Sequence, residues 1–394
     1  MNILTFTTLY PNAEEPHHGI FVENRLRHLV ATGNIDLRVI APVPYFPFTN
    51  PRFGTYAKYA RTPRRETRHG IPIDHPRYLL PPKIGMHLAP FTMYLGARSA
   101  VRELLRQGFK PDLIDAHYFY PDGIAAALIA RDLQIPFVVT ARGTDINLIP
   151  KYPIPRREIL WAADRAGAMI TVCQALNDEL QALGAPADKI TTLRNGVDLV
   201  GFQPVDRQAA RARLGLTRPT LLSVGHLIER KGHHLIIEAM TQLPGVDLLI
   251  AGSGPDEARL KAQIARLGLD DRVRLLGRIA HEDLKNVYGA ADLLVLASSR
   301  EGWANVLLEA MACGTPVAAT DIWGTREVVA APQAGWLIPE RTSDDIARII
   351  AHALPNLPDR AATRAYAEGF SWDDTTEGQL RIFNRILADR LTDR

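Results

Sequence analysis

The sequence predicts an α/β fold made of two doubly wound, Rossmann-like domains, and three observations predict it. The chain has 394 residues, which is too long for one ordinary hydrophobic core and suits two domains. Short apolar runs alternate with amphipathic helical patterns, which is typical of βαβ units and a parallel sheet. Polar side chains suited to chemistry follow the ends of these runs, where such sheets bind ligands.

Composition excludes several other classes of protein. Hydrophobic residues make up 46% and charged residues 23%, as in ordinary globular domains. No stretch reaches the roughly 18 apolar residues of a membrane span, and the N-terminus lacks the basic region of a signal peptide. The two cysteines, Cys173 and Cys313, have no CxxC pattern, which argues against a disulfide framework or a zinc site. We therefore expect a cytoplasmic protein, soluble or peripheral on the plasma membrane.

The first domain is expected over residues 1–199. Its apolar runs predict strands at Ile3–Leu9, Leu37–Ala41, Leu113–Ala116, Phe137–Thr140, Met169–Val172 and Ile190–Leu193. Helical patterns fall between them, at Val22–Thr32 and Pro121–Leu133. The turn-prone NGVD and GFQP sequences near Val200 indicate the linker.

The second domain is expected over residues 200–374. Its predicted strands are Thr220–Val224, Asp247–Ala251, Val273–Leu276, Asp292–Ala297 and Pro316–Ala319. Its helical patterns include Leu235–Leu243, Pro255–Leu267 and Val306–Cys313. A last helical stretch, Thr375–Leu391, follows FSWDD. Two such domains are expected to face each other across a cleft.

The most informative motif is SREGWANVLLEAMACGTPV, residues 299–317, in which a strand runs through a polar turn into a helix. Asn305 is suited to cap the helix, whose N-terminus offers N–H groups and a positive dipole end to a phosphate. Glu309, about 6 Å further along the axis, is placed to accept hydrogen bonds from a ribose. Glu301 is placed to hold hydroxyls of a sugar. A glutamate on a helix usually faces solvent, so Glu309 alone is weak evidence.

The turn HLIERKGH, which contains His226 and Lys231, follows the first strand of the second half. Lys231 is suited to supply a positive charge that offsets the negative charge of a leaving diphosphate, although a lone lysine is usually only solvated. The GSGP turn brings Gly252 and Gly254 close to a nucleotide, but it is not a GxGxxG fingerprint because the third position is Glu257. There is also no GxxxxGK[ST] phosphate loop.

Polar residues follow strand ends in the first half as well. His117 is a hydrogen-bond partner for a transferred sugar or an acceptor, or else a packing histidine. Arg142 and Asp145, in TARGTD, come after the next strand, where an arginine binds phosphate or an anionic acceptor. Gly19 lets backbone approach a diphosphate at the start of the first helix, or is an ordinary turn glycine.

Net charge is only +3, but residues 52–83 hold eight lysines and arginines against Glu66 and Asp74. The same stretch carries four aromatic rings, and three more precede it. Three interpretations of this basic, aromatic segment are possible: it contacts an anionic membrane surface, it binds an anionic acceptor, or it is a solvated loop whose aromatic rings anchor it to the domain. The sequence leaves these readings open.

The chain resembles the family-4 glycosyltransferases of GT-B architecture. The features that carry the resemblance are EGWANVLLEAMACG, ERKG, GSGP, LLGRI and RNGVD, together with YPNAEEPHHGIFV and VVTARGTDI, which look most like bacterial surface-polysaccharide transferases of the teichuronic-acid type. The resemblance covers essentially the whole chain.

The resemblance implies a role for each matching residue. Glu309 binds the donor ribose, Glu301 the donor sugar and Lys231 the diphosphate, and the loop of Arg278 holds the base. The backbone from Ala304 through Asn305 and Val306 to Leu307 completes these contacts. It also implies retention of anomeric configuration, no metal ion, and packing of residues 375–394 on the first domain.

Two positions depart from the family pattern. His226 stands where an arginine of the diphosphate site is common, and Arg142 stands where many relatives have His-Gly. We hypothesise that Arg142 supplies the missing charge. Because Arg142 replaces His-Gly, the acceptor contacts of those relatives are not carried over to this chain.

The expected function is therefore transfer of a hexosyl group from a nucleotide-sugar to a polysaccharide, lipid-linked oligosaccharide or related acceptor in cell-surface glycan synthesis. The nucleotide-sugar is a co-substrate, and neither a further cofactor nor a nucleic-acid partner is expected. A nucleotide-sugar epimerase needs the same donor site and stays open as an alternative. A nucleotide-cofactor oxidoreductase is disfavoured because GxGxxG is absent, and a silent polysaccharide-binding protein because Lys231, Glu301 and Glu309 are present.

Overall fold

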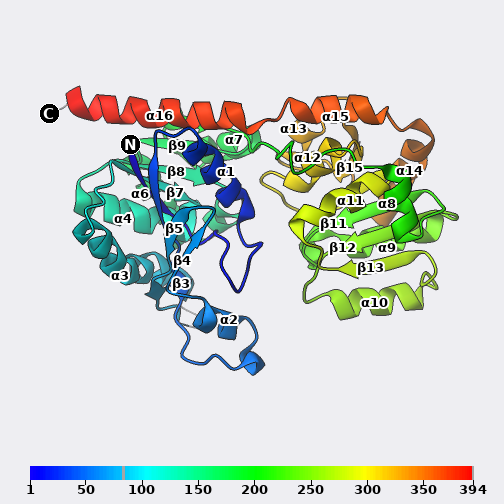
Figure 1. Cartoon of the computed structure of the whole chain (residues 1–394), viewed down its shortest axis with the longest axis horizontal. Coiled ribbons are helices and arrows are strands. Elements are labelled where there is room, and N and C mark those ends of the chain that lie inside the picture. Colours follow the sequence, from blue (N-terminus) through cyan, green and yellow to red (C-terminus); the bar gives the residue numbers. More distant parts are fainter. Residues whose placement is uncertain (82–84, 393–394) are drawn as a thin grey trace. The chain divides into compact units, whose positions relative to one another are not determined.

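The computed structural model describes residues 1–81 and 85–392, and they form two compact units (Figure 1). Unit 1 comprises Met1–Arg194 and the chain from Asp373 onward, whereas unit 2 comprises Asn195–Trp372. The divisions therefore fall a few residues before the expected points at 199/200 and 374/375. No helix among the described residues is long and apolar enough to cross a membrane.

Unit 1 is built on an eight-stranded sheet in the order β10-β9-β8-β7-β1-β2-β5-β4. The strands are β1 (Asn2–Phe6), β2 (Asp36–Ile40), β4 (Arg65–Arg68), β5 (Ile71–Asp74), β7 (Leu113–His117), β8 (Phe137–Ala141), β9 (Ala168–Thr171) and β10 (Ile190–Thr192). Only the pairing of β4 with β5 is antiparallel within this sheet. The strands β3 (Val43–Pro44) and β6 (Arg77–Tyr78) pair separately. Strand order reverses between β7 and β1, which is the switch point at which doubly wound sheets bind ligands.

Helices cover this sheet and include the last helix of the chain. They are α1 (Ile20–Ala31), α2 (Thr55–Arg61), α3 (Gly85–Arg106), α4 (Ile124–Leu133), α5 (Thr144–Asn147), α6 (Pro153–Arg165), α7 (Gln174–Ala182) and α16 (Trp372–Thr392). Phe383 and Ile386 of α16 join the same buried cluster as Leu26 of α1 and Val138 of β8. Burial of these apolar side chains holds α16 on unit 1.

Unit 2 has a six-stranded parallel sheet in the order β13-β12-β11-β14-β15-β16. The strands are β11 (Thr220–Val224), β12 (Asp247–Ala251), β13 (Val273–Gly277), β14 (Leu293–Leu296), β15 (Val317–Thr320) and β16 (Gly335–Ile338). The helices are α8 (Arg207–Leu214), α9 (His233–Ala239), α10 (Glu257–Arg266), α11 (Leu284–Ala290), α12 (Asn305–Ala312), α13 (Thr325–Val328), α14 (Ser343–Ala353) and α15 (Arg360–Glu368). The switch point lies between β11 and β14, the strands that precede Lys231 and Glu301.

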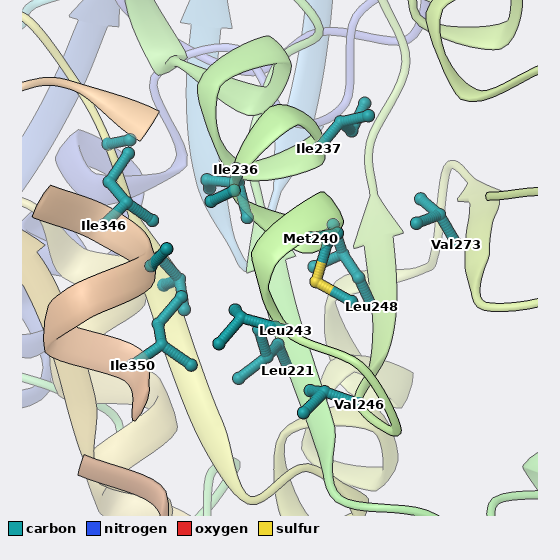
Figure 2. Packing of buried hydrophobic residues seen from close by; sticks show 14 of the residues in the cluster. Leu221, Ile236, Ile237, Met240, Leu243, Val246, Leu248, Val273, Ile346 and Ile350 are labelled. Atoms are coloured by element: carbon teal, nitrogen blue, oxygen red, sulfur yellow. The ribbon is translucent and has the colours of Figure 1, made fainter. Parts of the chain in front are cut away.

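The core of unit 2 lies between this sheet and helices α9 and α14. Ile236 of α9 and the α14 pair Ile346 and Ile350, spaced i and i+4 on one helical face, are fully buried with Leu221 and Leu248 of the sheet (Figure 2). Leu221 and Leu248 are register partners in β11 and β12. This packing fixes β11, the strand that leads into the Lys231 turn.

The predicted parallel strands are confirmed, with shifts at their ends. The expected strand Ile3–Leu9 stops at Phe6, because the chain turns where the Thr7 hydroxyl accepts from the Leu9 amide and donates to the His117 carbonyl. The pattern Leu235–Leu243 splits into α9 and a 3₁₀ turn, Met240–Gln242. Sequence reasoning missed the edge strands β4 and β16 and also β5, which lies next to β4, since short or partly polar strands carry a weak apolar signal.

Candidate donor site

Lys231 ends a short 3₁₀ turn, Glu229–Lys231, that follows β11. Gly232 comes next with φ +72°, and a Cβ at this position would lie 2.0 Å from the Ala297 carbonyl oxygen, just beyond β14. Only glycine permits this left-handed conformation and this close approach. The lysine is thereby held between the carboxyl ends of β11 and β14.

Lys231 forms a partly buried ion pair with Glu301. The Lys231 Nζ lies 2.6 Å from the Glu301 Oε1, and the Ser298 hydroxyl donates to the same oxygen at 2.7 Å. Arg230 adds a second cation, 3.7 Å from the Glu301 Oε2. Burial raises the pKa of the Glu301 carboxyl, but Lys231 and Arg230 outweigh it, so the net pKa is below its usual value. The site therefore holds an ionised carboxylate between two cations.

The helix α12 begins one residue earlier than expected. Asn305 was expected to cap it, but the capping position is Ala304, Asn305 is the first helical residue, and no side chain caps the helix. The Asn305 side-chain oxygen instead accepts a hydrogen bond from the Asn195 amide at 3.4 Å. The sequence misled because Asn is a common cap, whereas here tertiary contact engages the side chain. An uncapped N-terminus leaves first-turn N–H groups such as that of Val306 suited to an anion, whereas the Leu307 amide donates to the Ala304 carbonyl at 3.0 Å.

Glu309 lies on α12 behind this N-terminus and is only partly exposed. The Tyr288 hydroxyl donates to its Oε2 at 2.8 Å, and the His281 Nε2 lies 3.6 Å from its Oε1. Burial lowers the pKa of His281, but the Glu309 carboxylate outweighs it and the net pKa is raised. Sequence reasoning missed Tyr288 and His281, since no local spacing links them to Glu309.

The glycines of the GSGP turn have a packing reason. A Cβ on Gly252 would lie 1.9 Å from the Gly225 carbonyl oxygen, and one on Gly254 would lie 2.4 Å from the Leu227 carbonyl oxygen. The Leu227 amide also donates a hydrogen bond to the Ser253 carbonyl of this turn, at 3.0 Å. Glycine is thus required for the contact of two loops, and an approach to a nucleotide stays a prediction.

His226 and Arg278 are the two exposed members of the predicted donor set. His226 follows β11, and Arg278 directly follows β13. Both side chains therefore lie at the carboxyl edge of the sheet of unit 2, as strand order requires.

In unit 1, His117 is fully buried at the end of β7. The Arg142 guanidinium donates to its Nδ1 at 2.6 Å, and its Nε2 lies 3.2 Å from an Asp115 carboxylate oxygen. Burial lowers the pKa of His117 to about 4, so the ring is neutral at neutral pH with its proton on Nε2. The structure brings His117 and Arg142 together, and an acceptor contact for either stays a prediction.

Asp145 lies beside this pair, but its carboxylate binds backbone amides. Its carboxylate accepts hydrogen bonds from the amides of Phe119 at 2.8 Å, Gly143 at 2.8 Å and Arg142 at 3.1 Å. Three charge-assisted bonds of this kind fix a loop. The carboxylate thus shapes the loop that carries Arg142.

Gly19 is the N-cap residue of α1, with φ +69°. A Cβ here would lie 2.3 Å from the Leu9 backbone. Close packing of the loop after β1 therefore explains this glycine.

A buried polar chain links α16 to His117. The Gln379 amide donates to Asp115 at 2.9 Å, and its oxygen accepts from the Arg25 Nε at 2.9 Å. Gln379, Arg25 and Asp115 are all buried. The last helix therefore contributes to the support of the histidine.

The basic segment carries less free charge than its sequence implies. Four of its cations form ion pairs: Lys58 with Glu15 at 3.3 Å, Arg61 with Glu14 at 2.7 Å, Arg65 with Asp74 at 2.8 Å and Arg68 with Glu23 at 2.6 Å. Lys83 lies outside the described residues. Arg52 and Arg64 have no acid partner in the described part of the chain. Several rings nearby are exposed, including Phe48 and Tyr56. Both cysteines are buried, and neither forms a disulfide in the described part of the chain.

Comparison with known proteins gives two family matches that together span most of the chain. Residues 205–370 match the family described as "Glycosyl transferases group 1", and residues 19–200 match "Glycosyltransferase Family 4". A putative teichuronic acid biosynthesis glycosyltransferase of Bacillus subtilis is 30% identical over 333 residues, covering 82% of each chain. A D-inositol 3-phosphate glycosyltransferase of Mycolicibacterium smegmatis is 32% identical over 301 residues, covering 71% of this chain and 68% of that one.

Solved structures give the same fold. Sucrose-phosphate synthase from Thermosynechococcus elongatus superposes with a TM-score of 0.80 at 20% identity, covering 98% of this chain and 99% of that one. Anabaena HepE in complex with UDP-glucose gives 0.71 at 21% identity, covering 100% and 99%. The two Rossmann-like units of this chain, its family matches and its curated relatives all indicate the same family. This chain belongs to the glycosyltransferases of GT-B architecture, with group 1 and family 4 domains.

Proposed function

We propose that this chain is a retaining, metal-independent hexosyltransferase. It moves a sugar from a nucleotide-sugar to a polysaccharide, lipid-linked oligosaccharide or related acceptor in cell-surface glycan synthesis. The single observation that carries the proposal is the contact between Lys231 and Glu301 at the β11–β14 switch point, with Glu309 on the helix that follows.

In this proposal each site residue of unit 2 binds one part of the donor. Lys231 and the N-terminus of α12 bind the diphosphate, Glu301 the sugar hydroxyls and Glu309 the ribose. Arg230, beside Lys231, supplies the second positive charge of the diphosphate site. Arg278 and the GSGP turn contact the base. These assignments use the chemistry of each side chain: cations and free N–H groups for phosphate, carboxylates for hydroxyls.

The proposed reaction breaks the bond between the anomeric carbon and the diphosphate oxygen and forms one from that carbon to an acceptor oxygen. The acceptor proton passes to the departing diphosphate, so no protein base is required. Lys231 offsets the negative charge that develops on the leaving group. His117 and Arg142 of unit 1 are proposed acceptor-side groups, with Arg142 recognising an anionic part of the acceptor.

The first test is a panel of UDP-, GDP- and ADP-sugars. We expect one nucleotide class to raise the melting temperature and to be slowly hydrolysed, because a ligand that binds only the folded state stabilises it. The measurement combines thermal shift with release of the nucleoside diphosphate, repeated in EDTA, which should leave hydrolysis unchanged. Stabilisation by a nicotinamide cofactor instead of any nucleotide-sugar would contradict the proposal. Conversion of the donor to its epimer, with no free nucleotide released, would favour an epimerase.

We further propose that the basic, aromatic segment contacts an anionic membrane surface. Arg52→Gln combined with Arg64→Gln should weaken binding to phosphatidylglycerol-containing vesicles about 30-fold, since each cation near such a surface contributes roughly 1 kcal/mol. Vesicle cosedimentation at low and at physiological salt measures this. The matched control is Lys261→Gln with Arg266→Gln, two exposed cations of α10. Equal binding by both double variants would rule out the electrostatic contact.

A further inference from the structure

Unit 1 has an apolar groove that the donor chemistry does not use. It has a volume of about 620 Å³, and its lining residues come from α4 and from α3 and α6, each of which packs against α4. Figure 1 shows these three helices in unit 1. Its lining is mainly hydrocarbon and aromatic: Phe91, Ile124, Leu128, Ile154 and Trp161, with Arg131, Arg157 and Glu158. A volume of this size is typical of ligand pockets.

The groove reaches the functional edge of the sheet of unit 1. Ile124 begins α4, shortly after His117 at the end of β7, and Ile154 is the second residue of α6, which follows β8 and α5. Helices that connect parallel strands begin at the carboxyl edge of the sheet and run back along it. One end of the groove therefore lies at the edge that carries His117 and Arg142.

Apolar exposure is concentrated in unit 1 and includes two residues of this groove. Eleven of the twelve exposed large apolar side chains among the described residues belong to unit 1, and Val200 is the exception. Phe91 and Ile154 of the lining are 45% and 50% exposed, and Leu88 and Tyr152 lie near them in the sequence, at 40% and 47%. Exposed apolar side chains that line a groove are typical of a binding site rather than of an ordinary protein face.

Charge at the groove favours an anionic ligand. Arg157 is exposed and forms no ion pair with any described residue, whereas Arg131 pairs with its neighbour Asp132 at 3.3 Å. Arg156 and Lys151 are also exposed near the start of α6. Glu158 is the single acid of the lining, and burial raises the pKa of its carboxyl, which favours its neutral form. An apolar channel beside unpaired cations matches a hydrocarbon chain that carries a phosphate.

We propose that the groove between α3, α4 and α6 binds the hydrocarbon chain of an amphiphilic acceptor, with Arg157 contacting the acceptor phosphate. The inference rests on the proposed function, because it is the transferase reaction that makes this amphiphile an acceptor. It narrows the acceptor to a lipid phosphate or diphosphate and excludes a purely water-soluble glycan.

The test uses n-alkyl phosphates from butyl to dodecyl as monomers, with binding followed by calorimetry and by fluorescence of Trp161 in the lining. Affinity should rise about fourfold per added methylene until the groove is filled, because each buried methylene contributes a constant increment. Alkyl alcohols of equal length should bind more weakly, and Arg157→Gln should abolish the difference between phosphate and alcohol. Affinity that does not depend on chain length would overturn the proposal.

Variants locate the binding. Phe91→Glu and Ile154→Glu, at exposed positions that tolerate charge, should each weaken dodecyl phosphate binding at least tenfold. Val200→Glu, at a side chain 83% exposed in unit 2, is the matched control and should not. Equal affinity in all three variants would place binding elsewhere and overturn the assignment.

Further outcomes separate other occupants and the proposed function itself. If Phe91→Glu weakens vesicle binding while the wild type binds no monomeric alkyl phosphate, the surface contacts a bilayer and not a single chain. A wild-type dimer that Phe91→Glu dissociates would make the groove a contact between copies. Donor hydrolysis without chain-length dependence overturns the groove and leaves the transferase standing. Alkyl phosphate binding without use of any nucleotide-sugar overturns the transferase and, with it, the acceptor assignment.

Discussion

Lys231→Met should lower kcat/KM for the nucleotide-sugar by about 10²–10³-fold, the usual cost of removing one preorganised group that stabilises developing charge. The loss should fall mainly on kcat, since the diphosphate gains negative charge as the glycosidic bond breaks. Steady-state kinetics with saturating donor measure it. Lys261→Met, at an exposed lysine of α10, is the matched control and should change nothing.

Lys231 also neutralises Glu301, so stability must be separated from catalysis. Lys231→Met alone should lower the free energy of unfolding by about 3 kcal/mol at pH 7, because it leaves a buried carboxylate with only Arg230 nearby. The double variant Lys231→Met, Glu301→Gln removes both charges and should regain most of that stability while staying inactive. Recovery of donor use together with stability would show that Lys231 serves Glu301 alone. Denaturant unfolding and donor hydrolysis distinguish the two results.

The pH dependence of this pair has a definite sign. The net pKa of Glu301 is below its usual value in the folded protein. Its contribution to stability is therefore present above the ordinary glutamate pKa and is lost as pH falls through the lowered pKa. Lys231→Met removes the main cause of that shift and should bring the acid transition to higher pH.

Glu309→Gln should raise the donor KM by about 10–150-fold, with a smaller change in kcat. The carboxylate loses charged hydrogen bonds to the ribose worth about 1.5–3 kcal/mol, and the ribose is equally bound in the ground and transition states. The substitution conserves shape, and Tyr288 retains an acceptor at this position. Glu257→Gln, at an acid of α10, is the matched control.

A nucleotide series makes the ribose assignment specific. The wild type should bind the ribonucleoside diphosphate of its donor more tightly than the 2′- or 3′-deoxy form, because a site built for a hydroxyl leaves buried polar groups unpaired without it. Glu309→Gln should lose most of this preference, as measured by calorimetry. If the variant discriminates as well as the wild type, Glu309 does not contact the ribose.

The positions of the strands along the chain, and of their ends, could be predicted in large part from the sequence. Thr220–Val224 and Asp247–Ala251 were expected with the bounds that β11 and β12 have. Fully buried parallel strands read as continuous apolar runs, which makes them easy to find. The same reasoning placed Lys231, Glu301 and His117 after strands, because polar residues at the carboxyl ends interrupt those runs.

Helix ends and loop glycines were less predictable. Asn305 has the chemistry of a cap, yet its contact with Asn195 lies 110 positions away in the chain. The glycines of GSGP were predicted to approach a nucleotide, which stays a prediction, and the sequence did not reveal that packing on Gly225 and Leu227 also requires them. The local conformational preference of a residue contributes only a small free energy, and a tertiary contact of similar free energy overrides it.

By itself, the sequence determined the two-domain α/β class, the glycosyltransferase family and the strand ends where reactive side chains gather, because hydrophobic periodicity and short motifs are local properties. Only the tertiary structure decided which side chains meet. Glu301 pairs with Lys231 across 70 positions, Tyr288 donates to Glu309 and Gln379 of the last helix holds Asp115 beside His117. Strand order brings such residues together, and strand order is fixed by the packing of whole helices and sheets, which no local pattern encodes.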